Sequence, residues 1–374
     1  MTMQVCLFTD ADVFAGTERH IYELGCGLVE AGLQVQISCP SPSPLATKAE
    51  AHGIPVLPVG KHGLIDRAAI QIMAGELRAG RIEVLHAHNG RTALIAALAV
   101  QIARKGVCVA TQHFLEPNHV TQSGFKAIPS HLAHHWVRAK TKHFIAISQA
   151  VTQNMLARRE APVDKITVVP NGLSCETVSP EDAAVLRAEF RIAPYAPLLV
   201  CVARLEAEKG IASLLAAFRA VGERVLDARL LVVGEGSQRQ GLEAEARELG
   251  IARAVQFAGF REDARTAIAA ADVFVLPSPA EPFGLVLLEA MALGKAVVAM
   301  NAGGPREIVV MGETGLLVPP DDPAALAEGL VRLLSAPGER QRLGDGGRRR
   351  YEEHFTTQRM ADATRQVYER AVGQ

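Results

Sequence analysis

Short apolar runs rich in β-branched residues alternate with helix-length segments from one end of the chain to the other. The runs are apolar on both faces, which is typical of parallel strands covered by helices on both sides of a sheet. No short repeat of fixed period occurs, so a solenoid is excluded and the pattern predicts parallel α/β sheets. We expect strands at residues 4–9, 35–39, 54–59, 84–88, 107–112, 143–147 and 167–170 in the first half, and at 198–203, 230–234, 255–258, 273–277, 296–300 and 315–318 in the second.

The length of 374 residues suits two domains rather than one. Residues 171–197 are rich in Pro, Ser and Ala and separate the two alternating patterns, so we interpret them as a linker. We therefore expect a domain at 1–170, a second at 171–355, and a C-terminal helix within 356–374 that crosses back to the first. Two doubly wound Rossmann-like domains facing across a cleft would place their ligand-binding loops after the carboxyl ends of the strands.

Composition excludes several classes of protein. Hydrophobic residues make up 49% and charged residues 21% of the chain, which is typical of a globular protein and not of a disordered one. The six cysteines are scattered without C-x-x-C pairs, which argues against a zinc site and against a disulfide framework. No signal-peptide pattern and no long apolar run is present, so we expect a cytoplasmic protein.

The net charge of −1 hides an asymmetry between the two halves. Residues 1–170 carry 16 Lys and Arg against 12 Asp and Glu, whereas residues 171–374 carry 23 against 28. Within the first half, the segment 126–159 is basic and rich in histidine. Either this segment is a solvated helical face, or it contacts an acidic acceptor or the anionic inner face of a membrane. We expect no nucleic-acid partner.

The stretch EPFGLVLLE places two carboxylates, Glu281 and Glu289, around the start of an apolar helix. The backbone N–H groups of Phe283, Gly284 and Leu285, together with the helix dipole, would attract a phosphate. Glu281 would lie in the loop after a strand and Glu289 about two turns into the helix. Carboxylates in these places suit hydrogen bonds to sugar hydroxyl groups.

Two cations follow the strand at 198–203. Arg204 lies at the strand end and Lys209 five residues later, just before a helix, where together they would neutralise a diphosphate. Gly234 lies in the sequence VVGEGSQR, where it permits close approach of the backbone. The third glycine of G-x-G-x-x-G is missing and no P-loop occurs, so neither a nicotinamide nor a P-loop site is predicted.

In the first half, Gly16 opens a helix after the first strand, and its N-terminus is a further candidate for anion binding. His86, His88 and His113 follow or end strands. A single histidine in such a place is often structural, so both a structural and a functional role stay open for each of them.

Taken together, the motifs ARLEAEKG, VVGEG, EPFGLVLLE, VVPNGL, AGGPREIV and GETGLLVPPDD resemble, in order and spacing, those of the retaining glycosyltransferase family four, whose members have the GT-B fold. The resemblance extends over nearly the whole chain. It implies that Arg204 and Lys209 hold the diphosphate of a nucleotide sugar, that Glu289 binds the ribose and that Glu281 binds the donor sugar.

The same resemblance implies backbone contacts from Phe283 and Gly284, an approach of His113 to the sugar hydroxyls, and a backbone contact near Phe260 with the base. The family often has a Gly-Gly pair in its first loop, and this chain has Ala15-Gly16 instead. Backbone contact between that loop and a ligand is therefore less secure.

The implied activity is retaining transfer of a hexose-type sugar to a hydroxyl of a glycan, a lipid-linked or a small-molecule acceptor. We expect a UDP-sugar first and GDP-mannose second, with no cofactor and no metal. A nucleotide-sugar epimerase or sugar phosphorylase on the same scaffold is one alternative. A non-enzymatic sugar-binding protein is the other, although it would not need paired cations for a diphosphate.

Overall fold

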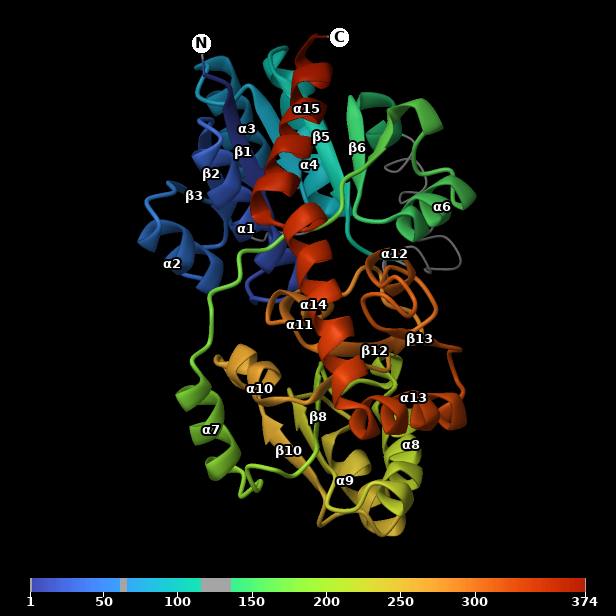
Figure 1. Cartoon of the computed structure of the whole chain (residues 1–374). Helices are drawn as coiled ribbons and strands as arrows, with labels where there is room; N and C mark the ends of the chain where they lie inside the picture. Colours follow the sequence, from blue (N-terminus) through green and yellow to red (C-terminus); the bar gives the residue numbers. More distant parts are fainter. Residues whose placement is uncertain (1, 61–65, 116–135, 374) are drawn as a thin grey trace. The chain divides into compact units, whose positions relative to one another are not determined.

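A computed structural model describes residues 2–60, 66–115 and 136–373 (Figure 1). The chain forms two compact units. Unit 1 comprises Met1–Ser174 and Thr356–Gln374, and unit 2 comprises Cys175–Phe355. The last segment of the chain, red in Figure 1, therefore belongs to the same unit as the first.

Unit 1 is built on a parallel sheet of seven strands in the order β3-β2-β1-β4-β5-β6-β7. The order reverses at β1, whose neighbours are β2 on one side and β4 on the other. The strands are β1 (Gln4–Phe8), β2 (Gln34–Cys39), β3 (Val56–Pro58), β4 (Val84–Ala87), β5 (Val107–Gln112), β6 (His143–Ala146) and β7 (Ile166–Val168).

Helices α1 and α15 pack against each other and share one apolar core with the sheet of unit 1. The core joins Leu7 and Ile37 of the strands to Leu24 of α1 and Tyr368 of α15. Helix α15 therefore completes the core of unit 1. The helices described in this unit are α1 (Gly16–Glu30), α2 (Pro44–Ala51), α3 (Arg67–Arg78), α4 (Gly90–Ala103), α6 (Gln149–Ala157), the 3-10 turn η1 (Val163–Lys165) and α15 (Thr357–Gly373).

Unit 2 is built on a parallel sheet of six strands in the order β10-β9-β8-β11-β12-β13. Here the order reverses at β8, which lies between β9 and β11. The strands are β8 (Leu198–Val202), β9 (Arg229–Val233), β10 (Val255–Gly259), β11 (Val273–Leu276), β12 (Ala296–Met300) and β13 (Leu316–Val318).

The apolar residues of this sheet pack with those of α8, α9 and α13 in one core, and α11 packs against α10 and α14. The helices of unit 2 are α7 (Pro180–Glu189), the 3-10 turn η2 (Ala207–Lys209), α8 (Ile211–Arg224), α9 (Arg239–Glu248), α10 (Ala264–Ala270), α11 (Leu285–Ala292), α12 (Pro305–Ile308), α13 (Pro323–Ser335) and α14 (Pro337–His354).

Helix α7 lies inside the segment 171–197 that the composition suggested as a linker. Ser179 caps its first turn by accepting a hydrogen bond from the N–H of Asp182 at 3.0 Å. Arg187 then donates to the carbonyl oxygen of Ala270 at the end of α10. These bonds make α7 part of unit 2.

The prediction of two parallel α/β domains is confirmed, since the predicted strands form two all-parallel sheets. All six cysteines are free thiols. None of the helices in the described ranges is both long and apolar enough to span a membrane.

Candidate active site

In unit 2 the loops that follow β8 and β11 leave neighbouring strands where the strand order reverses. From β8 the chain continues to β9 on one side, and from β11 it continues to β12 on the other. Ligands of open α/β sheets bind at this kind of switch point, beyond the carboxyl ends of the strands. The predicted residues Arg204 and Lys209 follow β8, and Glu281, Phe283 and Gly284 follow β11.

The structure brings Lys209 and Glu281 into direct contact across this switch point. The ammonium nitrogen of Lys209 donates to Oε2 of Glu281 at 2.7 Å, and the side chains are only 18% and 14% exposed. A partly buried ion pair is held by the surrounding fold rather than by attraction alone, because desolvation offsets much of the Coulomb energy. The pair therefore offers a cation and an acceptor of hydroxyl hydrogen bonds side by side.

Glycines in two neighbouring loops let the backbone around Glu281 pack closely. Gly210 has φ +68° and a Cβ there would overlap the carbonyl oxygen of Pro277; Gly303, at φ +57°, would likewise overlap that of Glu281. The N–H of Gly304 donates to the same oxygen of Glu281 at 2.9 Å. The loops after β8, β11 and β12 thus fix the position of Glu281.

Helix α11 begins at Leu285, because Gly284 precedes it in a left-handed conformation at φ +107° and is a cap without a side chain. Glu289 is therefore the fifth residue of the helix, and the prediction that it lies about two turns in was wrong. Its buried carboxylate accepts a hydrogen bond from Nε of Arg265 at 3.4 Å. The two carboxylates of EPFGLVLLE thus contact different cations, and Arg265 was not predicted from the sequence.

The remaining residues predicted in unit 2 differ in exposure. Arg204 is 64% exposed, and its guanidinium pairs with Glu208 at 2.8 Å. Gly234 has φ +136° and a Cβ there would overlap the carbonyl oxygen of Ala203, which explains the need for glycine. Phe260 follows β10 and is 74% exposed, whereas Phe283 is buried.

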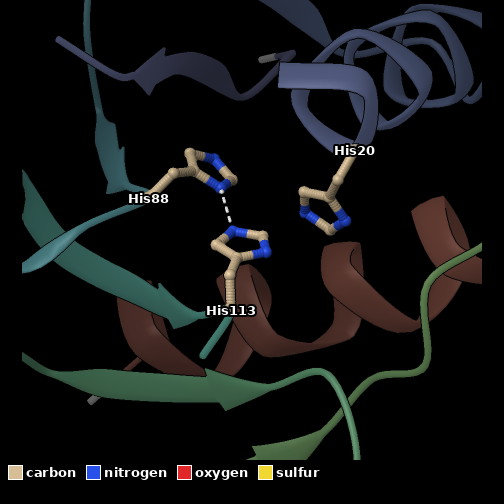
Figure 2. Close-up of side chains that lie close together, drawn as sticks. All are labelled: His20, His88 and His113. Carbon is tan, nitrogen blue, oxygen red and sulfur yellow. Dashed lines mark hydrogen bonds between the residues drawn. The ribbon is translucent and has the colours of Figure 1, made fainter. Parts of the chain in front are cut away.

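Unit 1 has its own switch point, between β1 and β4, and three histidines gather there. Figure 2 shows His20 of α1, His88 after β4 and His113 after β5 pointing toward one another. Nδ1 of His88 lies 3.2 Å from Nε2 of His113, and all three side chains are buried. The sequence predicted His113 but not His20, whose position in an amphipathic helix carries no functional signal.

Burial keeps these three imidazoles neutral. Desolvation lowers the pKa of His20 to about 4, although nearby Asn171 and Glu23 act in the opposite direction. Desolvation and then the neighbouring imidazoles lower the pKa of His88 and His113 well below the usual range. The edge of this sheet therefore offers uncharged ring nitrogens.

His86 has a structural role inside β4. Its Nδ1 lies 2.6 Å from the hydroxyl of Tyr368 on α15, and its Nε2 lies 2.7 Å from Oγ1 of Thr111. Both ring nitrogens have partners, so this histidine ties the C-terminal helix to the sheet. Gly16, by contrast, opens α1 at the surface, with nothing within 4 Å of a Cβ built on it.

A polar network that the sequence did not reveal lies beside the start of α4. Asp10 follows β1 and accepts a hydrogen bond from the side chain of Asn89 at 2.7 Å. Arg91 also pairs with Asp10, and a second contact of 3.8 Å joins it to Asp66. The network holds the loop after β1, which precedes Gly16.

Of the basic segment 126–159, residues 126–135 lie outside the described residues.

Residues 14–177 match the family described as Glycosyltransferase Family 4, and residues 182–350 match Glycosyl transferases group 1. The chain is 30% identical to a glycogen synthase of Mycobacterium tuberculosis, over 95% of this chain and 91% of that one. It is 32% identical to a phosphatidyl-myo-inositol mannosyltransferase of the same species, over 97% and 95% of the two chains. HepE of Anabaena in complex with UDP-glucose superposes with a TM-score of 0.84 at 23% identity, over the full length of both chains.

Proposed function

We infer the function from the premise that this chain belongs to glycosyltransferase family 4 and has the GT-B fold. The proposed activity is transfer of a hexose-type sugar from a nucleotide diphosphate sugar to an acceptor hydroxyl, with retention of configuration. The observation that carries the proposal is the contact between Lys209 and Glu281 at the switch point of unit 2. A UDP-sugar is the favoured donor, since the HepE structures contain UDP or UDP-glucose. GDP-mannose is second, because one relative is a mannosyltransferase.

Lys209 and Arg204 supply the positive charge for the departing diphosphate. A diphosphate gains negative charge as its bond to the sugar breaks, and fixed cations at that place lower the barrier. Lys209 is already held in a partly buried position, and Arg204 is exposed on a loop from which its guanidinium can exchange Glu208 for a phosphate. With two protein cations at the diphosphate, this step needs no metal ion there.

The carboxylates and His113 hold the hydroxyl groups of the donor. Glu281 accepts hydrogen bonds from the transferred sugar and Glu289 from the ribose, and His113 binds a hydroxyl of the sugar. The backbone N–H groups of Phe283, Gly284 and Leu285 at the start of α11 bind phosphate oxygens. The backbone near Gly234 and Phe260 contacts the nucleoside, and the backbone at Gly16 contacts the donor.

The reaction proceeds through an oxocarbenium-like state. The bond between the anomeric carbon and the diphosphate oxygen breaks, and the acceptor oxygen forms its bond on the same face of the ring. The proton of the acceptor hydroxyl moves to the departing diphosphate. Attack on the face that the diphosphate leaves accounts for retention.

The acceptor is a glycan, a lipid-linked or a small-molecule hydroxyl, and the basic segment 126–159 is proposed to contact an anionic membrane. Arg138, Lys140 and Lys142 lie in its described part. Each basic group near an anionic surface contributes about 1 kcal/mol. Sedimentation with anionic vesicles at low salt tests this proposal, and equal sedimentation with and without vesicles contradicts it.

The test of the main proposal is nucleotide release from UDP-, GDP- and ADP-sugars by the purified protein and its Glu281→Ala variant, in magnesium or in EDTA. We expect release from one donor, unchanged by EDTA and lost in the variant. Release that requires free phosphate would identify a phosphorylase instead, and conversion of the sugar without an acceptor would identify an epimerase. If no donor releases its nucleotide and calorimetry detects no donor binding, the proposal is contradicted.

A further inference from the structure

The three-histidine cluster of unit 1, defined as His20, His88 and His113, has more ring nitrogens than hydrogen bonds. Three rings carry six nitrogens, yet the single hydrogen bond within the cluster joins His88 to His113. Among the described residues, both nitrogens of His20 and Nε2 of His88 are buried without a partner. Buried polar atoms nearly always have partners, so an unpaired set of this size calls for a bound group.

His86 shows that the lack of partners is particular to the cluster. Its ring lies 4.2 Å from that of His88, between centroids, and is equally buried. Both of its nitrogens nevertheless have hydroxyl partners, Tyr368 and Thr111. The fold therefore satisfies a purely structural histidine at this depth, and the three histidines next to it are arranged differently.

The spacing of the cluster fits a transition metal. One ligand nitrogen from each ring can be chosen so that all three lie within 4.8 Å of one another. Zinc–nitrogen bonds of about 2.0–2.1 Å in a tetrahedron place the ligand nitrogens roughly 3.3 Å apart. Nδ1 of His88 and Nε2 of His113 lie 3.2 Å apart, which matches this separation, so an ion would take the place of the hydrogen bond that joins them.

We propose that unit 1 binds one divalent transition-metal ion, zinc being favoured, through His20, His88 and His113. Neutral imidazole is a ligand for zinc, copper, iron and nickel, whereas magnesium and calcium take oxygen ligands. The fourth position of a tetrahedral ion remains for water or a substrate hydroxyl. The scattered cysteines argued against zinc, but a ligand set drawn from α1 and from the loops after β4 and β5 has no sequence spacing to reveal it.

Asn171 supplies the outer contact that such a site requires. Metal-bound histidines usually donate their second ring N–H to an oxygen, which fixes the orientation of the ring. The side-chain oxygen of Asn171 is buried without a hydrogen-bond partner, and Asn171 lies next to His20. In the proposed site, the second ring N–H of His20 would donate to this oxygen.

The site goes beyond the proposed function and does not depend on it. The ion would lie in unit 1, whereas the cations at the diphosphate belong to unit 2. His113 would bind the ion through Nε2 and keep Nδ1 for a sugar hydroxyl. If a chelator stops nucleotide release and also removes zinc from the protein, the ion in unit 1 is needed for activity. If a chelator stops release while zinc stays bound, the proposal of a metal-free diphosphate step is contradicted.

The experiment uses the full chain, produced in medium with added zinc and passed over a chelating resin. Elemental analysis measures zinc per chain, and cobalt added to stripped protein reports a tetrahedral site by its visible absorption. We expect about one ion per chain, as for other sites with three histidines, and an intense cobalt spectrum. The variants His20→Gln and His88→Gln should lose both, while His52→Gln, an exposed histidine of the same unit, should keep both.

Circular dichroism shows whether each variant is folded, and a zinc-dependent rise of the melting temperature in the unmodified chain provides a readout that needs no variant. Absence of zinc, of a cobalt spectrum and of any thermal shift would overturn the proposal and assign buried water to the cluster. An equal loss of zinc from His52→Gln would overturn it as well.

Discussion

The switch points of the two units have the same topology and opposite chemistry. In unit 2 the loops after β8 and β11 bring a positive and a negative side chain into contact, Lys209 and Glu281, with part of each exposed. In unit 1 the residues after β4 and β5 are neutral imidazoles, buried together with His20. The strand order makes both places suitable for a ligand, and the residue types that follow the strands decide which ligand is suited.

The largest effect should come from Lys209→Ala, which removes the cation of the charged switch point. Turnover of the nucleotide sugar should fall about 10²–10³-fold, as when one charge-stabilising donor is lost. Steady-state kinetics provide the measurement, with Arg219→Ala as the control because Arg219 is an exposed cation of the same unit. Full activity of Lys209→Ala would mean that the charged switch point of unit 2 does not act on the diphosphate.

Glu281→Gln sharpens the comparison by removing charge while keeping shape. A hydrogen bond to a charged group is worth about 1.5–3 kcal/mol, so turnover should fall roughly 10- to 150-fold. Glu223→Gln, at an exposed position of α8, is the matched control. If kcat and KM of the Glu281 variant both stay within about twofold of the unmodified enzyme, the carboxylate has no role in donor binding.

Gly303→Ala tests whether the loop after β12 positions Glu281. The substitution forces a Cβ against the carbonyl oxygen of Glu281 in a left-handed conformation, and donor affinity should fall about tenfold. Gly312→Ala shares the left-handed backbone, at φ +77°, but has open space around its Cβ. Both variants should lose stability, and calorimetry should show weaker donor binding only for Gly303→Ala.

Tyr368→Phe should have the smallest effect on catalysis and a clear one on stability. It leaves Nδ1 of the buried His86 without a partner, which costs about 1–3 kcal/mol of the free energy of unfolding. Urea denaturation measures the loss, with the exposed Tyr195→Phe as the control. Unchanged stability would mean that the hydrogen bond between Tyr368 and His86 does not stabilise the fold, so His86 would not differ in this respect from the three-histidine cluster beside it.

Much of the fold could be predicted because buried parallel strands appear as continuous apolar runs, which is a local property of the sequence. Helix α7 was taken as part of a linker because its Pro- and Ala-rich sequence carries a weak pattern, and its contact with α10 is tertiary. The start of α11 was misplaced because the left-handed conformation of Gly284 depends on its surroundings.

The site was visible only in part. Lys209 and Glu281 were each predicted from a motif, but their contact joins residues 72 positions apart and requires the order of the strands. His20, Asn171 and Arg265 belong to helices and loops where their residue types are ordinary. Their roles depend on their burial and on the side chains that they contact in the folded protein, and a single sequence does not give this information.

The central claim is that the charged switch point of unit 2 binds the donor through its diphosphate. Calorimetric titration of UDP and of uridine into the unmodified chain and into Lys209→Ala tests it most directly, using the corresponding pair if the donor panel identifies another base. The account predicts that UDP binds far more tightly than uridine and that the variant loses about 10- to 150-fold of this advantage, with uridine binding unchanged. An equal advantage of UDP in both proteins would contradict it.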